Sequence, residues 1–165
     1  MERALITNLK FVLFLLILFF IHLLFYQYLV LGEVYPDLFL VLVVYCALRW
    51  GPDGGSISGF ICGIIQDSFS YTYFGLHAVV KTIIGFAIGK VRHSFFSNKY
   101  IVQAAIILTS KIFHDIIFYS IYFSRGEESF WRQMIFHTAP SAFYTCILGV
   151  AFFIMFRFKA AIKSW

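Results

Sequence analysis

Charged residues are scarce in this chain, and their scarcity excludes a large class of proteins. Only 13% of the 165 residues are charged, whereas 61% are hydrophobic, and the mean hydropathy is +0.86. A water-soluble domain of this length needs a charged surface that this chain does not have. Phenylalanine alone supplies 22 residues, which suits a surface that faces lipid. We therefore predict an integral membrane protein with a single domain, residues 1–165.

Cysteine is also scarce, and the motifs of familiar enzyme classes are absent. Cys46, Cys62 and Cys146 lie apart in apolar segments, without the spacing of a metal site or a disulfide framework. No serine lies in a nucleophile-elbow motif, and segment 51–55 lacks the Lys-Ser/Thr that completes a phosphate-binding loop. We expect a protein that is not an enzyme, with no catalytic residues, no metal and no cofactor.

A signal-peptide cleavage site is missing as well. The first apolar run, residues 11–31, contains 21 residues, enough to cross a hydrocarbon core of ~30 Å. It is longer than a typical signal-peptide core and no small-residue cleavage site follows it, so we interpret it as an uncleaved span. Five further spans bring the predicted total to six. The predicted spans cover residues 11–31, 37–50, 54–70, 75–91, 100–123 and 135–157.

The distribution of basic residues supports this arrangement. With both termini in the cytoplasm, nine Lys and Arg residues fall on the cytoplasmic side and only Arg125 and Arg132 fall outside. Anionic lipid attracts such residues, so the net charge of +5 requires no nucleic-acid partner. Segment 90–100 mixes basic and aromatic residues, but it lies between two predicted spans, and we interpret it as an interfacial loop. We predict an all-α bundle of six transmembrane helices with both termini cytoplasmic.

Small residues recur at every fourth position in two neighbouring predicted spans. Residues four apart share one face of a helix, and glycine on that face lets another helix approach closely. The first stripe ends in an acid and the second begins with two bases. Antiparallel packing then brings glycine against glycine, and Asp67 meets His77 or Lys81. The two stripes are Gly55, Gly59, Gly63 and Asp67, followed by His77, Lys81, Gly85 and Gly89.

The fifth predicted span adds Lys111, His114 and Asp115 at a similar depth. Together with Asp67 and Lys81, the two acids and two lysines form a neutral set, which charges inside a membrane require if they are to stay ionised. Three interpretations of this candidate cluster remain open. It is a structural ion-pair network that fixes helix register, a site for a ligand or ion, or a support for a surface that contacts a partner helix.

A series of short motifs, taken in order, resembles the MreD family of bacterial rod shape-determining proteins. The motifs are Tyr35-Pro36-Asp37-Leu38-Phe39-Leu40, Arg49-Trp50-Gly51, Gly59-Phe60-x-x-Gly63-x-x-x-Asp67, Gly75 and Asp115-Ile116-Ile117-Phe118. The likeness covers nearly the whole chain. Gln66 departs from the family pattern, in which an apolar residue usually precedes the aspartate, and it adds a polar group to the glycine-bearing face.

The resemblance implies a non-enzymatic, multi-pass subunit of the cell-wall elongation machinery in the bacterial cytoplasmic membrane. It implies that the chain binds MreC, a single-span membrane protein, within a wider complex of MreB, RodA and a class B penicillin-binding protein. The family fold is similar to that of the S-components of energy-coupling-factor transporters. The alternative function is therefore a substrate-binding S-component, in which the polar cluster holds a vitamin.

Overall fold

The computed structural model describes residues 34–69, 73–92, 100–122, 132 and 134–155. The first predicted span, residues 11–31, lies outside the described residues. Those described form helices and no β-strand, as the predicted all-α class requires. The elements are α2 (Leu38–Asp67), α3 (Leu76–Val91), α4 (Tyr100–Tyr122), the π-helix η2 (Met134–Thr138) and α6 (Ala139–Met155).

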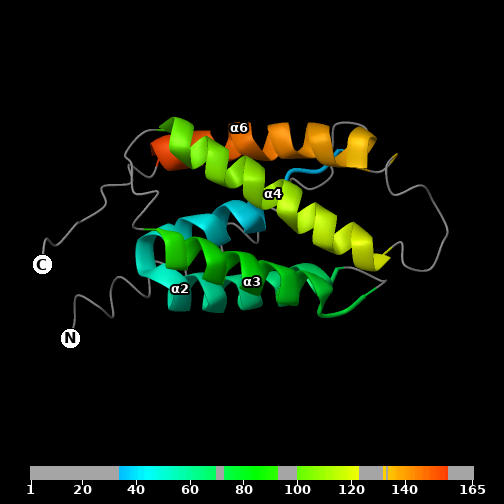
Figure 1. Cartoon of the computed structure of the whole chain (residues 1–165), viewed down its shortest axis with the longest axis horizontal. Coiled ribbons are helices and arrows are strands. Elements are labelled where there is room, and N and C mark those ends of the chain that lie inside the picture. The colour runs from blue at the N-terminus through cyan, green and yellow to red at the C-terminus, as the bar shows by residue number, and fades with distance from the viewer. Residues whose placement is uncertain (1–33, 70–72, 93–99, 123–131, 133, 156–165) are drawn as a thin grey trace, which may run out of the picture.

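Three segments of this fold are long and apolar enough to cross a membrane. By length and composition alone they are Leu38–Asp67, which is α2 counted across its break at Gly51, Ile101–Ile121 within α4, and Ile135–Ile154, which joins η2 to α6. The predicted number of six spans and the cytoplasmic position of the termini stay predictions. The helices lie in two layers, with α4 and α6 above α2 and α3 in the view of Figure 1.

Helix α2 is not one straight rod, because it breaks at Gly51. This glycine has φ 80° and ψ −159°, and Pro52 follows it. Glycine tolerates a positive φ, and proline lacks the N–H that would continue the helix. A Cβ built on Gly55 would lie 2.8 Å from the Cβ of Ala47, although residues eight apart in a straight helix are about 12 Å apart along the axis. The chain therefore turns back at Gly51, within the predicted separation of the second and third spans.

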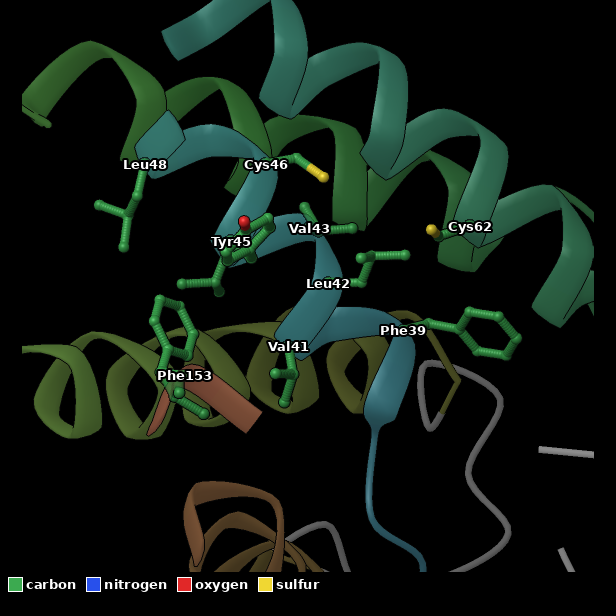
Figure 2. Packing of buried hydrophobic residues seen from close by; sticks show 11 residues of the cluster. Phe39, Val41, Leu42, Val43, Tyr45, Cys46, Leu48, Cys62 and Phe153 are labelled. Carbon is green, nitrogen blue, oxygen red and sulfur yellow. The ribbon is translucent and has the colours of Figure 1, made fainter. Parts of the chain in front are cut away.

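We call residues 38–50 the first arm of α2 and residues 52–67 its second arm. The first arm forms the centre of the fold, and the second arm runs back beside α3 (Figure 1). Phe39 to Leu48 are all buried, with exposed fractions of 7% or less. A helix that is apolar on every side fits only where other elements surround it. Figure 2 shows its side chains packed against Cys62 of the second arm and Phe153 of α6.

Glycine makes the contact between the second arm and α3 possible. A methyl group on Gly55 would collide with the carbonyl group of Gly85, and one on Gly85 would collide with that of Gly55. Gly59 lies in the same way against the backbone of Lys81, and Gly63 against Ala78. The remaining glycine of the α3 stripe, Gly89, faces the turn at Gly51 and Pro52 rather than a second-arm glycine. Backbone-to-backbone packing of this kind is typical of helices in membranes.

The outer faces of these helices carry large apolar side chains. Such a surface would be unusual on a protein surrounded by water, but it is the expected surface of one surrounded by lipid. Each helix contributes to it. Its exposed members include Ile57 and Phe60 on the second arm, Val79, Ile83 and Phe86 on α3, Phe113 on α4, and Phe143 and Ile147 on α6.

Candidate functional site

Lys81 is fully buried in the middle of α3, and its ammonium group lies against the carboxylate of Asp37. The Nζ atom donates to both carboxylate oxygens, at 2.7 Å to Oδ1 and 2.5 Å to Oδ2. A buried charge is tolerated only where a counter-charge and hydrogen bonds satisfy it. The ion pair therefore fixes α3 to the start of α2, 44 residues away in the sequence.

Asp37 also makes two contacts that involve the backbone. Its Oδ1 accepts the N–H of Leu40 at 2.9 Å, which caps the first turn of α2. Its own N–H donates to Oγ1 of Thr145 on α6, at 3.0 Å. One turn earlier on α6, Ser141 donates to the carbonyl oxygen of Tyr35 at 2.6 Å. Asp37 is thus the point at which α2, α3 and α6 are joined.

The expectation that Asp67 pairs with the side chain of His77 or Lys81 is wrong. Asp67 is completely buried, but its carboxylate accepts two backbone N–H groups at the start of α3. Oδ1 accepts from His77 at 3.1 Å and Oδ2 accepts from Ala78 at 3.0 Å. Lys81 is instead paired with Asp37. The sequence argument considered side-chain partners only, and it overlooked the unpaired N–H groups that every helix start presents.

The residue that precedes α3 explains why these N–H groups need Asp67. A helix is usually capped by a Ser, Thr, Asp or Asn side chain at its first position. Here that position is Gly75, which has φ 96° and no side chain to act as a cap. Asp67, at the end of α2, supplies the missing acceptor from a different helix. The positive end of the α3 dipole also offsets its negative charge.

A second polar network joins α4 to α3. Lys111 donates to both oxygens of Asp115, at 2.6 Å and 2.8 Å, across one turn of α4. Nδ1 of His114 lies 2.9 Å from Oδ1 of the same carboxylate. Nε2 of His114 lies 3.2 Å from Nδ1 of His77 on α3. The network therefore runs from Lys111 through Asp115 and His114 to His77.

The carboxylate partner assigns one proton of the two histidines, and the other follows if His114 is neutral. A carboxylate that is paired with Lys111 can only accept, so Nδ1 of His114 carries the proton. Nε2 of a neutral His114 then accepts from Nδ1–H of His77. Phe118 stacks on the His77 ring with a centroid distance of 4.4 Å and an interplanar angle of 13°. The pair of imidazoles is held between a carboxylate and an aromatic ring.

All six candidate residues of the predicted cluster thus lie at the α2–α3–α4 contact, but not as one mutual set. Lys111, His114 and Asp115 make a network that reaches His77, whereas Lys81 has Asp37 as its counter-ion and Asp67 serves the α3 backbone. Asp37 was selected from the sequence only as part of a family motif, at the start of the second predicted span. Its position before an apolar helix was a capping signal, but nothing in the sequence pointed to Lys81 as its partner.

Four further residues of the family motifs, Pro36, Arg49, Gly51 and Gly75, lie at or next to the ends of helical segments. Gly51 and Gly75 have positive φ values of 80° and 96°. Pro36 is buried directly before the Asp37 cap, and Arg49 is exposed at the end of the first arm. Gly51 and Gly75 therefore shape turns, and Pro36 and Asp37 begin and cap α2, so a structural role is sufficient to explain these four residues.

The polar groups of this site are largely satisfied by one another. In the described parts of the chain, no group of three or more His, Cys, Asp or Glu side chains is placed to hold a metal ion. Gln66 is different: its Oε1 atom is buried and has no hydrogen-bond partner among the described residues, and the same is true of Gln103. Among the described residues, the network ties α3 to α2 and to α4.

Comparison with known proteins gives one match. The sequence profile of the family described as rod shape-determining protein MreD matches residues 2–160. No curated protein and no solved structure matches the chain. The matched segment contains both glycine stripes and every residue of the polar networks described above.

Proposed function

The chain belongs to the MreD family of rod shape-determining membrane proteins, and from this premise we propose a specific place for it in the cell. It is a multi-pass protein of the bacterial cytoplasmic membrane, with six spans and both termini in the cytoplasm. It binds an MreC-like single-span protein and works with MreB, RodA and a class B penicillin-binding protein in the elongation of the cell wall. Its role is that of a scaffold and not that of an enzyme.

The observation that carries this proposal is the family match over residues 2–160. The geometry supports a scaffold for a physical reason. The buried Asp37–Lys81 ion pair joins the start of α2 to α3. Such a pair adds little net stability, but it favours one arrangement of these helices because a wrong arrangement leaves a buried charge unpaired. A protein that offers a fixed surface to partner helices needs that kind of specificity.

The alternative of a vitamin-binding S-component receives less support. A ligand site requires polar groups that are free to contact the ligand. Both lysines of the cluster are already bound to carboxylates, and Asp67 is bound to two backbone N–H groups. A ligand would have to displace these internal contacts, and each displacement leaves a buried group without its partner.

The proposal is tested by depletion of the protein from its host together with affinity purification. Loss of the protein should turn rods into spheres, and the tagged protein should retain an MreC-like partner after extraction in mild detergent. The control is re-expression of the wild-type chain, which should restore rods. Rods that persist after complete depletion, with loss of vitamin uptake, would establish the S-component function instead.

A further inference from the structure

Two arginines from different helices converge on the turn at Gly51. Arg49 is the second-last residue of the first arm of α2, and Arg92 follows the last residue of α3. Nη1 of Arg92 lies 3.5 Å from the carbonyl oxygen of Arg49, and a Cβ built on Gly51 would lie 2.9 Å from the same nitrogen. The turn of α2 and the end of α3 lie at the same end of the molecule in Figure 1. The guanidinium group of Arg92 therefore lies against the backbone of Arg49 and Gly51, at the end of the fold that also carries the side chain of Arg49.

The guanidinium group of Arg49 is held in place by its neighbours. It donates from Nη1 to the hydroxyl oxygen of Tyr45 at 2.7 Å. Its central carbon lies 5.9 Å from the ring centroid of Tyr45 and 5.5 Å from that of Trp50, within the range of cation–π contacts. The side chain is exposed, and within the described residues it forms no ion pair. Four of its five N–H donors are thus left for an acceptor outside these contacts.

The surroundings of the two arginines indicate which anion fits. Trp50, with 37% of its surface exposed, is the type of residue that lies at the boundary between lipid and water. Phe86 and Val91 on α3 are 49% and 43% exposed, so the apolar surface extends up to Arg92. An anion with apolar chains would contact both kinds of surface. The nearest carboxylate in the sequence, Asp53, is exposed and forms no ion pair with Arg49.

We propose that Arg49 and Arg92 bind the phosphate of an anionic phospholipid, whose acyl chains lie along the exposed face of α3. A guanidinium group offers two parallel N–H donors to a phosphate, and this geometry distinguishes it from the point charge of a lysine. Tyr45 is a positioning residue, because its hydroxyl group orients Arg49. The site is distinct from the buried polar networks.

The test uses the full-length protein in phosphatidylcholine nanodiscs with increasing fractions of phosphatidylglycerol that carries brominated acyl chains. Trp131→Phe and Trp165→Phe leave Trp50 as the single tryptophan, and bromine quenches its fluorescence when the lipid is bound. Half-maximal quenching should require about fivefold more phosphatidylglycerol in Arg49→Gln, from the contribution typical of one basic residue at a membrane surface. Arg49→Lys should resemble Arg49→Gln, and Tyr45→Phe should lie between these variants and the parent.

The matched control is Arg132→Gln, which removes the same charge from the segment before η2 and should leave the quenching curve unchanged. A parent curve identical to that of brominated phosphatidylcholine would overturn the proposal, and so would equal effects of Arg132→Gln and Arg49→Gln. Full binding by Arg49→Lys would exclude a bidentate phosphate site. Competition by millimolar inorganic phosphate would identify a soluble phosphate ligand in place of the lipid.

Discussion

Removal of one partner of the Asp37–Lys81 ion pair should destabilise the protein more than removal of both. Asp37→Asn keeps an oxygen that can cap α2 at Leu40 but removes the negative charge, and Lys81→Met keeps the length of the side chain but removes the ammonium group. Each single change leaves one buried charge without its counter-ion. The double variant leaves neither, so it should be less destabilised than the sum of the two single variants.

The expected loss in the free energy of unfolding follows from the burial of both charged groups. The side chain of Lys81 is 0% exposed and that of Asp37 is 5% exposed, so solvent cannot compensate either charge. Breaking a buried pair by removing one partner costs about 3–5 kcal/mol. The hydrogen bond from the N–H of Leu40 to the carboxylate of Asp37 moderates the loss in Lys81→Met, so that variant should lie near the lower value. We expect a coupling energy of roughly 2–3 kcal/mol between the two positions.

The assay is reversible unfolding of the purified protein in mixed micelles, with helix content as the signal. The four proteins of the cycle are measured under identical conditions. A second cycle pairs Asp37→Asn with Arg132→Gln, an exposed residue with no contact to the ion pair, and should be additive. Additive losses in the first cycle would refute the reasoning, because they would mean that the two charges do not stabilise each other in the membrane protein.

Two further predictions concern the backbone of the fold. Gly59→Ala should cost about 1–3 kcal/mol in the same unfolding assay, because its methyl group would collide with the backbone of Lys81, whereas Ile57→Ala on the exposed face of the same arm should cost much less. Cysteines introduced at Asn98 and Ser129 should react with a membrane-impermeant reagent from opposite sides of the membrane, and labelling of both from one side would exclude the six-span topology.

The helical class, the turn near Gly51 and the face shared by the glycines could be predicted because each depends on local sequence. The composition indicated that lipid and not water surrounds the protein. The Gly51-Pro52 pair interrupted an apolar run and predicted a turn there. A spacing of four residues placed the glycines on one face of a helix. The contact of Gly55 with Gly85 follows from two such faces and a short connection between them. These inferences required no knowledge of contacts between segments far apart in the sequence.

The pairing of the buried charges could not be predicted in the same way. The described residues include three buried carboxylates, and their order in the sequence does not determine which one Lys81 reaches. The choice depends on where the first arm of α2 places Asp37, and that arm is positioned by its apolar packing on all sides. Thr145 lies 108 residues after Asp37 and accepts a hydrogen bond from its backbone N–H. No motif or spacing in the sequence indicated this contact.

The last prediction concerns Asp67, whose carboxylate accepts backbone N–H groups at the start of α3 and does not pair with the expected side chains. Asp67→Ala should destabilise the protein by roughly 2–4 kcal/mol, because it leaves the N–H groups of His77 and Ala78 buried without an acceptor. Asp67→Asn keeps one acceptor and should cost about half as much. If Asp67 serves the start of α3 and not Lys81, then Asp67→Ala and Lys81→Met should be additive to within about 0.5 kcal/mol in the unfolding assay. A coupling energy as large as that of the Asp37–Lys81 cycle would return Asp67 to the role of a counter-ion. It would also mean that the carboxylate reaches Lys81 in the membrane and leaves the first turn of α3 uncapped.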